Sequence, residues 1–356
     1  MGHRIAIIGS GATAHAAAAT FSLQGNSVAL ADLPQYGDAL GSVMDRGGIL
    51  LRGNGLVGFA KPDLVTTDVP SATRDADAVI ISVVAGRHEE IARAIAGTLS
   101  AGQVVAIAPG NAGSLIFDRA LKAKASGAII GEIQGNLFPC RLTGPAEVLA
   151  GGGLRKKRFA AYPAKRTPDA IRSLDGILEL EAARHVFEVA LNSPNVIIHL
   201  ISAALNASKI EDMGEDFSLF IHGLTPGVLR AVDAAWLEWR AVMDALGYWQ
   251  MDSPAEYLRL VADRGARPEL DVFRSLKGPD SLRHRYVSED APCGVSLLVS
   301  LAKAAGVEVP LTMAALTLFS VINGVDYYAQ GRTLENFGLA GRSPSEIDRL
   351  LIDGAD

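Results

Sequence analysis

The short apolar run Ile5–Ile8 is followed at once by the glycine-rich segment Gly9–Ala14, which leads into an alanine-rich stretch. Gly9 allows the chain to turn sharply after a strand, and Gly11 lets another group approach the backbone closely. Ala14 is small enough for a following helix to pack tightly on that strand. This arrangement predicts the first strand–turn–helix unit of an α/β fold with a doubly wound parallel sheet.

The next 120 or so residues repeat the alternation of short β-branched runs and helical stretches, as expected for parallel βαβ units. Further strands are predicted at Ser27–Ala31, Ala78–Val83, Gln103–Ala108 and Ala128–Ile133. Helices are predicted at Ala14–Gln24, His88–Leu99 and Ser114–Lys124. A turn at Arg52–Gly55, between the apolar runs Ile49–Leu51 and Leu56–Val57, predicts an inserted β-hairpin.

Beyond about Leu180 the strand signal fades. Long segments such as Val228–Leu246 and Leu311–Ile322 have the apolar periodicity of helices. A chain of 356 residues also exceeds the size at which one core keeps growing. We therefore predict a Rossmann-type nucleotide-binding domain at residues 1–183 and an all-helical domain at residues 184–356.

The composition is that of a folded globular protein, with 49% hydrophobic and 20% charged residues. A net charge of −6 argues against a nucleic-acid partner, and the basic run Arg155–Arg158 is expected to be a solvated loop or strand edge. Cys140 and Cys293 lie far apart without partner spacing, so neither a disulfide nor a metal site is expected. The first strand leaves no room for a signal peptide, and polar residues interrupt the apolar stretches, so we expect a cytoplasmic protein without a membrane partner.

The glycine-rich turn also predicts a dinucleotide site, because phosphates bind well at a helix N-terminus that follows such a turn. The residues expected to contact the coenzyme there are Gly9, Gly11, Ala12, Thr13 and Ala14. Asp32 follows Gly9 by 23 positions, at the end of the second strand, where a carboxylate can accept both adenosine ribose hydroxyls. This favours NAD. Leu33–Tyr36 contains no arginine for a 2′-phosphate, but a loop from elsewhere in the chain could supply one, so NADP stays open.

Ser193 and Pro194 predict the start of a helix that runs to about Ala207. Between its ends the polar side chains stand at offsets of 0, 4, 7 and 11, which places them on one stripe; they are Asn195, His199, Ser202 and Asn206. Each buried polar group without a partner costs about 1 to 3 kcal/mol, so the stripe predicts a cavity that faces the nicotinamide. Histidine is suited to proton transfer near neutral pH, whereas the alternative is a histidine that hydrogen-bonds inside the core.

With these residues identified, the chain resembles the opine dehydrogenases, the family of octopine and nopaline dehydrogenases, which reductively join amino acids to 2-keto acids. The resemblance covers nearly the whole length. It rests on the order of four short segments: Asn195 to His199, Gly223–Pro226, Arg285–Asp290 and Gly331–Glu335.

The resemblance implies that His199 is the general acid/base, that Asp290 is its partner, and that Arg285 binds the keto-acid carboxylate. From the residues alone, Asp290 and Arg285 would be expected to form surface ion pairs. The resemblance also places Glu132 and Cys140 in the amino-donor pocket, although a structural role for Cys140 stays open. The stripe adds Asn195, which would orient the substrate or the nicotinamide amide, and Ser202 and Asn206 as substrate contacts. Two departures from the family pattern are Leu200, where a proline often follows the histidine, and His222, where a glutamate is often seen.

The implied activity is the NAD(P)H-dependent reductive condensation of an amino acid with a 2-keto acid through an imine. A homodimer is compatible with the sequence. A first alternative is a ketopantoate-type or 2-hydroxyacid reductase, which reduces a carbonyl without an amine and, in the ketopantoate case, carries a lysine where this chain has His199. A second alternative is a dinucleotide-sensing protein without turnover, against which the polar stripe argues.

Overall fold

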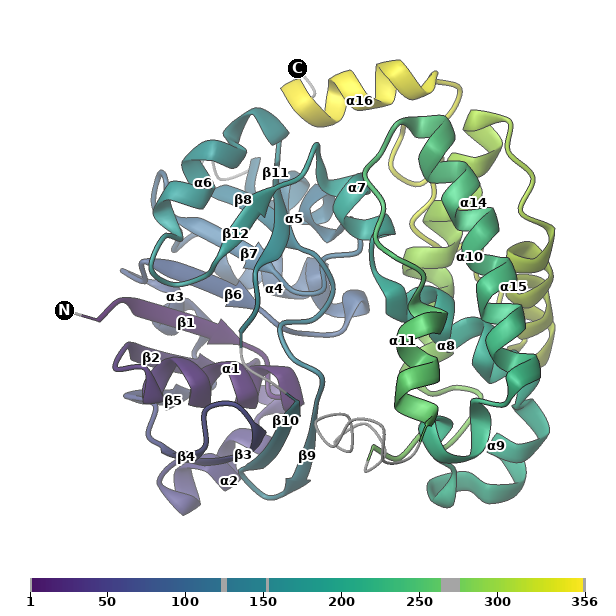
Figure 1. The fold of residues 1–356 in the computed structure, drawn as a ribbon. Coiled ribbons are helices and arrows are strands. Elements are labelled where there is room, and N and C mark those ends of the chain that lie inside the picture. The colour runs from purple at the N-terminus through teal and green to yellow at the C-terminus, as the bar shows by residue number, and fades with distance from the viewer. Residues whose placement is uncertain (1, 123–126, 152–153, 264–275, 355–356) are drawn as a thin grey trace. The chain divides into compact units, whose positions relative to one another are not determined.

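The computed structural model describes residues 2–122, 127–151, 154–263 and 276–354 (Figure 1). The chain divides into two compact units, which are described separately. The first comprises Met1–Val189 together with Leu351–Asp356, and the second comprises Ala190–Leu350. The boundary expected between residues 183 and 184 falls inside the first unit, close to its end.

The first unit is built around an eight-stranded sheet in the order β12-β11-β8-β7-β6-β1-β2-β5. Its strands are β1 (Arg4–Ile8), β2 (Ser27–Ala31), β5 (Leu64–Thr66), β6 (Ala78–Ile81), β7 (Val104–Ile107), β8 (Ile129–Ile133), β11 (Lys157–Tyr162) and β12 (Leu180–Ala182). The five predicted strands are confirmed as β1, β2, β6, β7 and β8, all paired in parallel. Only β11 runs antiparallel to its neighbour β8, because no crossover helix separates the two strands.

Helices cover both faces of this sheet, which makes it doubly wound. The helices of this unit are α1 (Ala12–Leu23), α2 (Asp38–Arg46), α3 (Val69–Thr73), α4 (His88–Ile95), α5 (Gly113–Lys122) and α6 (Thr167–Ser173), with short turns η1 (Pro34–Tyr36), η2 (Ala85–Arg87) and η3 (Ala164–Arg166). A further helix, α7 (Val186–Leu191), spans the boundary at Val189. Successive side chains of β1 enter two different cores: Ile5 and Ile7 pack with α1, and Ala6 and Ile8 pack with α4 and α5. The three predicted helices are confirmed, although α4 ends earlier than expected, because the chain turns near Gly97, and residues 123–124 of the third lie outside the described residues.

A second, four-stranded sheet has the order β4-β3-β10-β9, with β3 (Ile49–Asn54), β4 (Gly58–Ala60), β9 (Cys140–Gly144) and β10 (Glu147–Gly151). The predicted hairpin is confirmed, since Ile49 pairs with Ala60 across β3 and β4. The predicted turn position was wrong: Arg52, Gly53 and Asn54 continue β3, because they pair with β10 on its other edge, and the chain turns afterwards.

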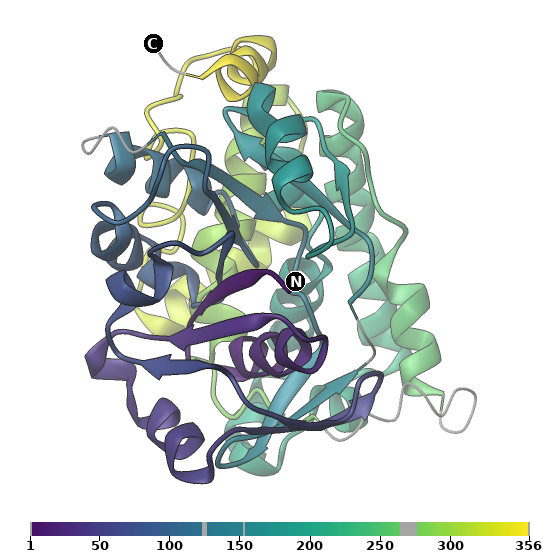
Figure 2. The same cartoon turned by 90° about the vertical axis from the view of Figure 1, so that its left-hand side faces the viewer.

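Helix α1 lies between the two sheets, against β1 and β2 on one side and the four-stranded sheet on the other (Figure 2). Every residue from Ala14 to Phe21 is buried. An alanine-rich helix without a polar face is what such a position requires, because neither side of it meets solvent. The residues that follow the glycine-rich turn are therefore held firmly in place.

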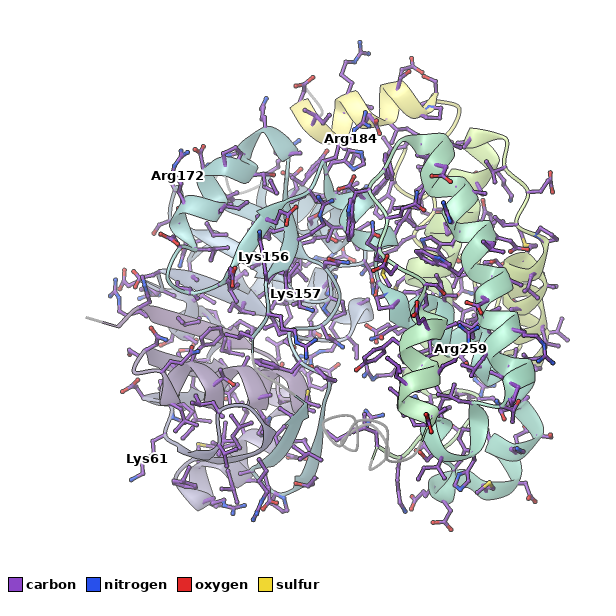
Figure 3. All side chains as sticks on the ribbon, viewed as in Figure 1. Lys61, Lys156, Lys157, Arg172, Arg184 and Arg259 are labelled. Carbon is purple, nitrogen blue, oxygen red and sulfur yellow. The ribbon has the colours of Figure 1, made fainter. Side chains whose placement is uncertain are left out.

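The basic run Arg155–Arg158 leads into β11, which begins at Lys157, directly after Lys156 (Figure 3). Lys156 Nζ lies 3.3 Å from Glu181, and Arg158 lies 3.2 Å from Glu181 and 3.0 Å from Glu188. Burial, assisted by the charge of Arg155, lowers the pKa of Lys157. Lys156 and Arg158 are thus paired with carboxylates of the same unit. The expectation holds for Arg155 and Lys156, which are exposed before the strand, but not for Lys157 and Arg158, because β11 lies between β12 and β8 and is not an edge strand.

The second unit is helical in its described part, apart from one isolated bridge between Ser218 and Gly278. Its helices are α8 (Pro194–Leu205), α9 (Ala207–Met213), α10 (Pro226–Leu246), α11 (Pro254–Ala262), α13 (Arg285–Ser288), α14 (Ser296–Ala305), α15 (Pro310–Asn323) and α16 (Pro344–Asp353), with a 3₁₀ turn η4 (Gly214–Asp216) and π-helical turns η5 (Leu219–Gly223) and η7 (Ala291–Val295). The predicted helices Val228–Leu246 and Leu311–Ile322 are confirmed as α10 and α15. The stretch Val186–Leu205 is long and apolar enough to cross a membrane, but 89% of its apolar window is buried inside the structure, as in a core helix.

Candidate active site

The glycine-rich turn connects β1 to α1 in a conformation that requires glycine at its first position. Gly9 has φ of +138°, and a Cβ there would lie 2.2 Å from the Ser82 carbonyl oxygen. A Cβ at Gly11 would meet nothing within 4 Å, so that side of the turn is open. Gly11 caps α1 without a side-chain hydrogen bond, and the first turn of α1 carries no acidic residue. The N–H groups and positive dipole end of α1 therefore suit an anionic ligand such as a pyrophosphate.

The next residues of the turn have distinct neighbours. Ala14 is fully buried, and its Cβ would lie 3.4 Å from a Cβ placed at Gly9, which explains the need for small residues at both places. Thr13 Oγ1 lies 3.6 Å from the Sγ atom of Cys140, the first residue of β9. Cys140, which was expected in the amino-donor pocket, is thus adjacent to the glycine-rich turn. Ala12 is partly exposed at the start of α1.

Asp32 is fully buried directly after β2 and lies beside the turn. Its Oδ2 atom accepts a hydrogen bond from the Ser10 hydroxyl at 2.7 Å, and its Oδ1 atom accepts one from the Leu33 N–H at 2.8 Å. The guanidinium of Arg87, in η2 after β6, donates to both carboxylate oxygens, with Nη1 at 3.2 Å from Oδ2. The Tyr36 ring covers that guanidinium, with 3.4 Å between the ring centroid and Cζ.

Sequence reasoning missed Arg87 because it lies 55 residues after Asp32. The only signal that could have found it is the order of the sheet. β6 and β2 flank β1, so loops that follow all three strands meet at the carboxyl edge, where ligands of such sheets bind.

In the second unit, His199 on α8 contacts Asp290, which follows α13 and precedes η7. Nδ1 of His199 lies 2.7 Å from Oδ2 of Asp290, and the two residues are only 7% and 8% exposed. With the carboxylate ionised, Nδ1–H is the donor, so Nε2 is the nitrogen that can accept a proton. Burial raises the pKa of Asp290 to about 7, against the opposing charge of Arg285. The structure therefore brings together the predicted histidine and its predicted partner.

The imidazole of His199 is also fixed from one face. The Tyr286 ring stacks on it with centroids 3.5 Å apart and an interplanar angle of 7°. His284 meets Tyr286 edge-on, at 4.7 Å between centroids, and its Nδ1 atom accepts a hydrogen bond from the Tyr286 N–H at 3.3 Å. Tyr286 lies within a segment that the sequence singled out, but its stacking role was not predicted, because a helical register of only four residues gives no periodicity to interpret.

Arg285 begins α13 and keeps 41% of its side chain exposed. Its Nη1 atom lies 3.7 Å from the Oε2 atom of Glu289, a buried residue that sequence reasoning also missed. Arg285 is near enough to Asp290 for its charge to oppose the rise in that carboxyl's pKa. An exposed guanidinium beside the histidine–aspartate pair is available to a carboxylate ligand.

The polar stripe of α8 is only partly a site feature. Asn195 is half-buried in the first turn, and Ser202 is fully buried, with no hydrogen-bond partner for its hydroxyl among the described residues. Asn206 donates to the carbonyls of Ser202, at 2.9 Å, and of Gly223, at 3.1 Å. These bonds support a structural role for Asn206, because carbonyls at the end of a helix need donors, and its expected contact with the substrate stays a prediction.

Glu132 on β8 is fully buried and holds the loop between β7 and α5. Its carboxylate accepts hydrogen bonds from the Ala112 N–H at 2.9 Å, the Ser114 N–H at 2.9 Å and the Ser114 hydroxyl at 2.5 Å. This loop contains two non-glycine residues of positive φ, Asn111 and Ala112. The observed bonds support a structural role, and the expected contact with an amino donor stays a prediction.

The two departures from the family pattern occupy structural positions. Leu200 is 1% exposed, within the buried part of α8. His222 lies in η5, where its Nδ1 atom accepts a hydrogen bond from the Ser218 N–H at 3.0 Å. Neither residue contacts the histidine–aspartate pair by a hydrogen bond that the structure shows.

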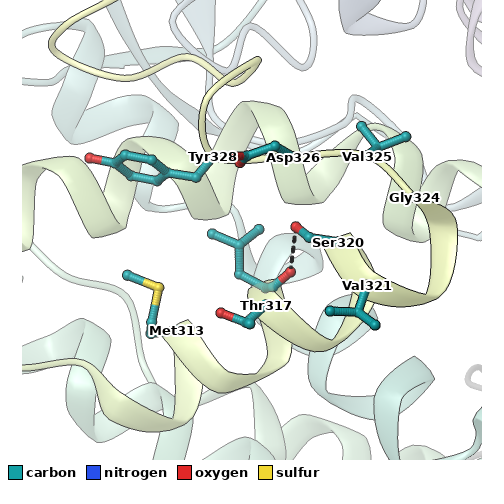
Figure 4. Close-up of a pocket in the computed structure, with 9 residues that line it drawn as sticks. Met313, Thr317, Ser320, Val321, Gly324, Val325, Asp326 and Tyr328 are labelled. Carbon is teal, nitrogen blue, oxygen red and sulfur yellow. Dashed lines mark hydrogen bonds between the residues drawn. The ribbon is translucent and has the colours of Figure 1, made fainter.

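A pocket of about 380 Å³ lies elsewhere in the second unit, along α15 (Figure 4). Its lining includes Met313, Thr317, Val321 and Tyr328, and Ser320 in its wall donates to the Leu316 carbonyl at 2.9 Å. None of the predicted site residues lines this pocket, so we assign it no part in catalysis.

Comparison with known proteins gives consistent results. Residues 182–323 match the family described as "NAD/NADP octopine/nopaline dehydrogenase, alpha-helical domain". An opine dehydrogenase of Arthrobacter sp. (strain 1C) is 32% identical over 96% of this chain and 97% of that protein. The structure of an octopine dehydrogenase in complex with NADH and agmatine matches with a TM-score of 0.72 at 17% identity, over 99% of this chain and 98% of the other. A yersinopine dehydrogenase with bound NADP⁺ matches with a TM-score of 0.66 at 13% identity, over 99% and 98% of the two chains. With a relative of this identity spanning nearly its full length, the chain belongs to the opine dehydrogenase family.

Proposed function

We propose that this protein is an NAD(P)H-dependent opine dehydrogenase, which condenses the amino group of an amino acid with a 2-keto acid and reduces the resulting imine to a secondary amine. The observation that carries the proposal is the buried pair of His199 and Asp290, in a chain whose other unit carries a glycine-rich turn suited to a dinucleotide. The family membership supports it, as do the NADH and NADP⁺ bound by the two related structures.

The first unit would hold the coenzyme. The pyrophosphate would rest on Gly9, Gly11, Ala12 and Thr13 at the start of α1, and the adenosine ribose would lie at Asp32. The open side of Gly11 and the uncapped end of α1 fit this group. NAD(P)H, when bound, supplies the hydride that reduces the imine carbon.

His199 would move the protons of the condensation. With Nδ1 held by Asp290, Nε2 can take two protons in turn from the amino group and pass them to the former keto oxygen. The first forms the carbinolamine hydroxyl, and the second lets that hydroxyl leave as water. Asp290 would stabilise the imidazolium that forms between these steps, and Tyr286 would keep the ring in one plane. A fixed tautomer matters, because the opposite one would present an N–H to the group that must lose its proton.

Arg285 would bind the carboxylate of the keto acid, because its guanidinium is exposed beside the dyad and matches a carboxylate in shape and charge. Asn195 lies one helical turn before His199 and is half-buried, so it would orient the substrate or the nicotinamide amide. The buried hydroxyl of Ser202 would also contact the substrate.

The test is a matrix of coenzyme-oxidation assays that crosses 2-keto acids with amino acids, with each partner also omitted. We expect oxidation only when both partners are present, and a product whose mass equals the two substrates minus one water plus two hydrogens. Oxidation with keto acid alone, unaffected by any amine, would instead identify a carbonyl reductase. Coenzyme binding without oxidation across the matrix would identify a nucleotide sensor.

A further inference from the structure

The carboxylate of Asp32 has all its hydrogen-bond acceptor positions in use. A carboxylate offers about four lone-pair directions. Ser10 and one arm of Arg87 donate to Oδ2, while Leu33 and the other arm of Arg87 donate to Oδ1. A ribose diol that binds Asp32 must therefore displace the guanidinium, so Arg87 takes part in any coenzyme contact at this residue.

Arg87 is held in a defined environment. Its side chain is 13% exposed, and one face of its guanidinium is covered by the Tyr36 ring. Its Nε atom is buried and makes no hydrogen bond among the described residues. Glu90 lies 3.7 Å from Nε, but its side chain is 41% exposed, so solvent weakens its charge. The guanidinium thus retains an unused donor next to the Asp32 carboxylate.

The two coenzymes place opposite demands on this position. NADH presents ribose hydroxyls that need an acceptor, whereas NADPH presents a 2′-phosphate that an unpaired buried aspartate would repel. Arg87 neutralises Asp32, and its planar fork matches the geometry of a phosphate. We propose that Arg87 is the residue that decides coenzyme choice: with it the site accepts both NADH and NADPH, and without it the site accepts only NADH.

This inference rests on the dinucleotide binding proposed above, and it is tested by binding rather than by turnover. Dissociation constants for NADH and NADPH would be measured by calorimetry or by fluorescence titration of the full-length protein. The variants are Arg87→Gln, Arg87→Lys and, as a matched control on the adjoining helix α4, Arg93→Gln, whose exposed side chain pairs only with exposed Glu89 among the described residues. Arg87→Lys keeps a cation beside buried Asp32, so it remains informative even if Arg87→Gln fails to fold.

We expect the unmodified protein to bind both coenzymes with dissociation constants within about tenfold of each other. Arg87→Gln should weaken NADPH binding by about 10- to 100-fold, because a charge-assisted bidentate contact is lost. NADH binding should stay the same or tighten. The NADPH dissociation constant of Arg87→Lys should lie between those of the unmodified protein and of Arg87→Gln, because lysine keeps the charge but loses the planar fork. Arg93→Gln should change neither constant.

If Arg87→Gln or Arg87→Lys weakened the binding of NADH and NADPH equally, the inference would be overturned. Such a result would show that Arg87 merely positions Asp32 or supports the adenine. An unmodified protein that binds NADH but excludes NADPH would overturn it as well. A protein that binds neither coenzyme would refute the proposed function itself, and this inference with it.

Discussion

Replacing Asp290 by asparagine removes one charge from the buried dyad and leaves its shape almost unchanged. Asn Oδ1 can still accept the hydrogen bond from His199 Nδ1, so the tautomer is retained, but the imidazolium loses its counter-charge. Two unit charges about 4 Å apart interact by about 4 kcal/mol at an effective dielectric constant of about 20. Because the amide dipole recovers part of this, we expect turnover to fall by about 10²- to 10³-fold.

The pH profile adds a second, independent readout for the same variant. Burial raises the pKa of Asp290 to about 7, so its carboxylate is mostly protonated below that pH and ionised above it. Wild-type kcat/KM should therefore rise with pH through about 7, a limb that belongs to the coupled pair rather than to either residue. In Asp290→Asn this limb should disappear or move.

The assay is steady-state coenzyme oxidation with both substrates across pH 5 to 9, roughly the range over which the dyad titrates, together with the dissociation constant for NADH. Asp244→Asn is the matched control, because Asp244 lies on α10 with 57% of its side chain exposed and its ion pair with Arg240 is worth little. Turnover of Asp290→Asn within about threefold of wild type, or an unchanged acid limb, would show that the carboxylate does not support the histidine.

Substitutions at three residues test other parts of the site. His199→Ala should lower turnover by about 10²- to 10⁴-fold while the NADH dissociation constant stays nearly constant, and full activity would end its assignment as acid/base. Tyr286→Leu should lower kcat by about tenfold, because the stacked ring no longer holds the imidazole, whereas Tyr286→Phe should retain most of it; equal losses would point to the hydroxyl instead. Asn206→Ala should destabilise the protein by about 1 to 3 kcal/mol in denaturant unfolding and leave KM unaltered, and a raised KM with unchanged stability would restore the role in substrate binding.

Much of the first unit was predictable from local pattern. The five parallel strands are nearly continuous apolar runs, and a strand buried on both faces leaves that signature regardless of its neighbours. The four-stranded sheet was not predictable beyond its hairpin, because β10 pairs with β3 across about a hundred residues. Because of the same long-range pairing, β3 continues to Asn54, through residues that were predicted to form the turn.

The site shows the same division. Periodicity places Asn206 on the polar stripe, but it reports only which side of a helix a residue occupies and not which group stands opposite it. The structure placed the Gly223 carbonyl there. Glu132 likewise could be assigned to a pocket only by resemblance, and the partners that the structure shows for it lie in the loop after β7 and in the first turn of α5.

By itself, the sequence determined the strand–turn–helix start, the presence of Asp32 at a strand end, and a histidine on an otherwise apolar helix. Each of these depends on conformational preferences and periodicities that act within a few residues. Only the tertiary structure decided that Arg87 pairs with Asp32 and that Tyr286 stacks on His199, and only it supplied the geometry of the His199–Asp290 pair that the family resemblance implied. These partners are separated by 55 residues in the first case and 91 between His199 and Asp290, and contacts at such distances are set by the order of the strands and the packing of the helices.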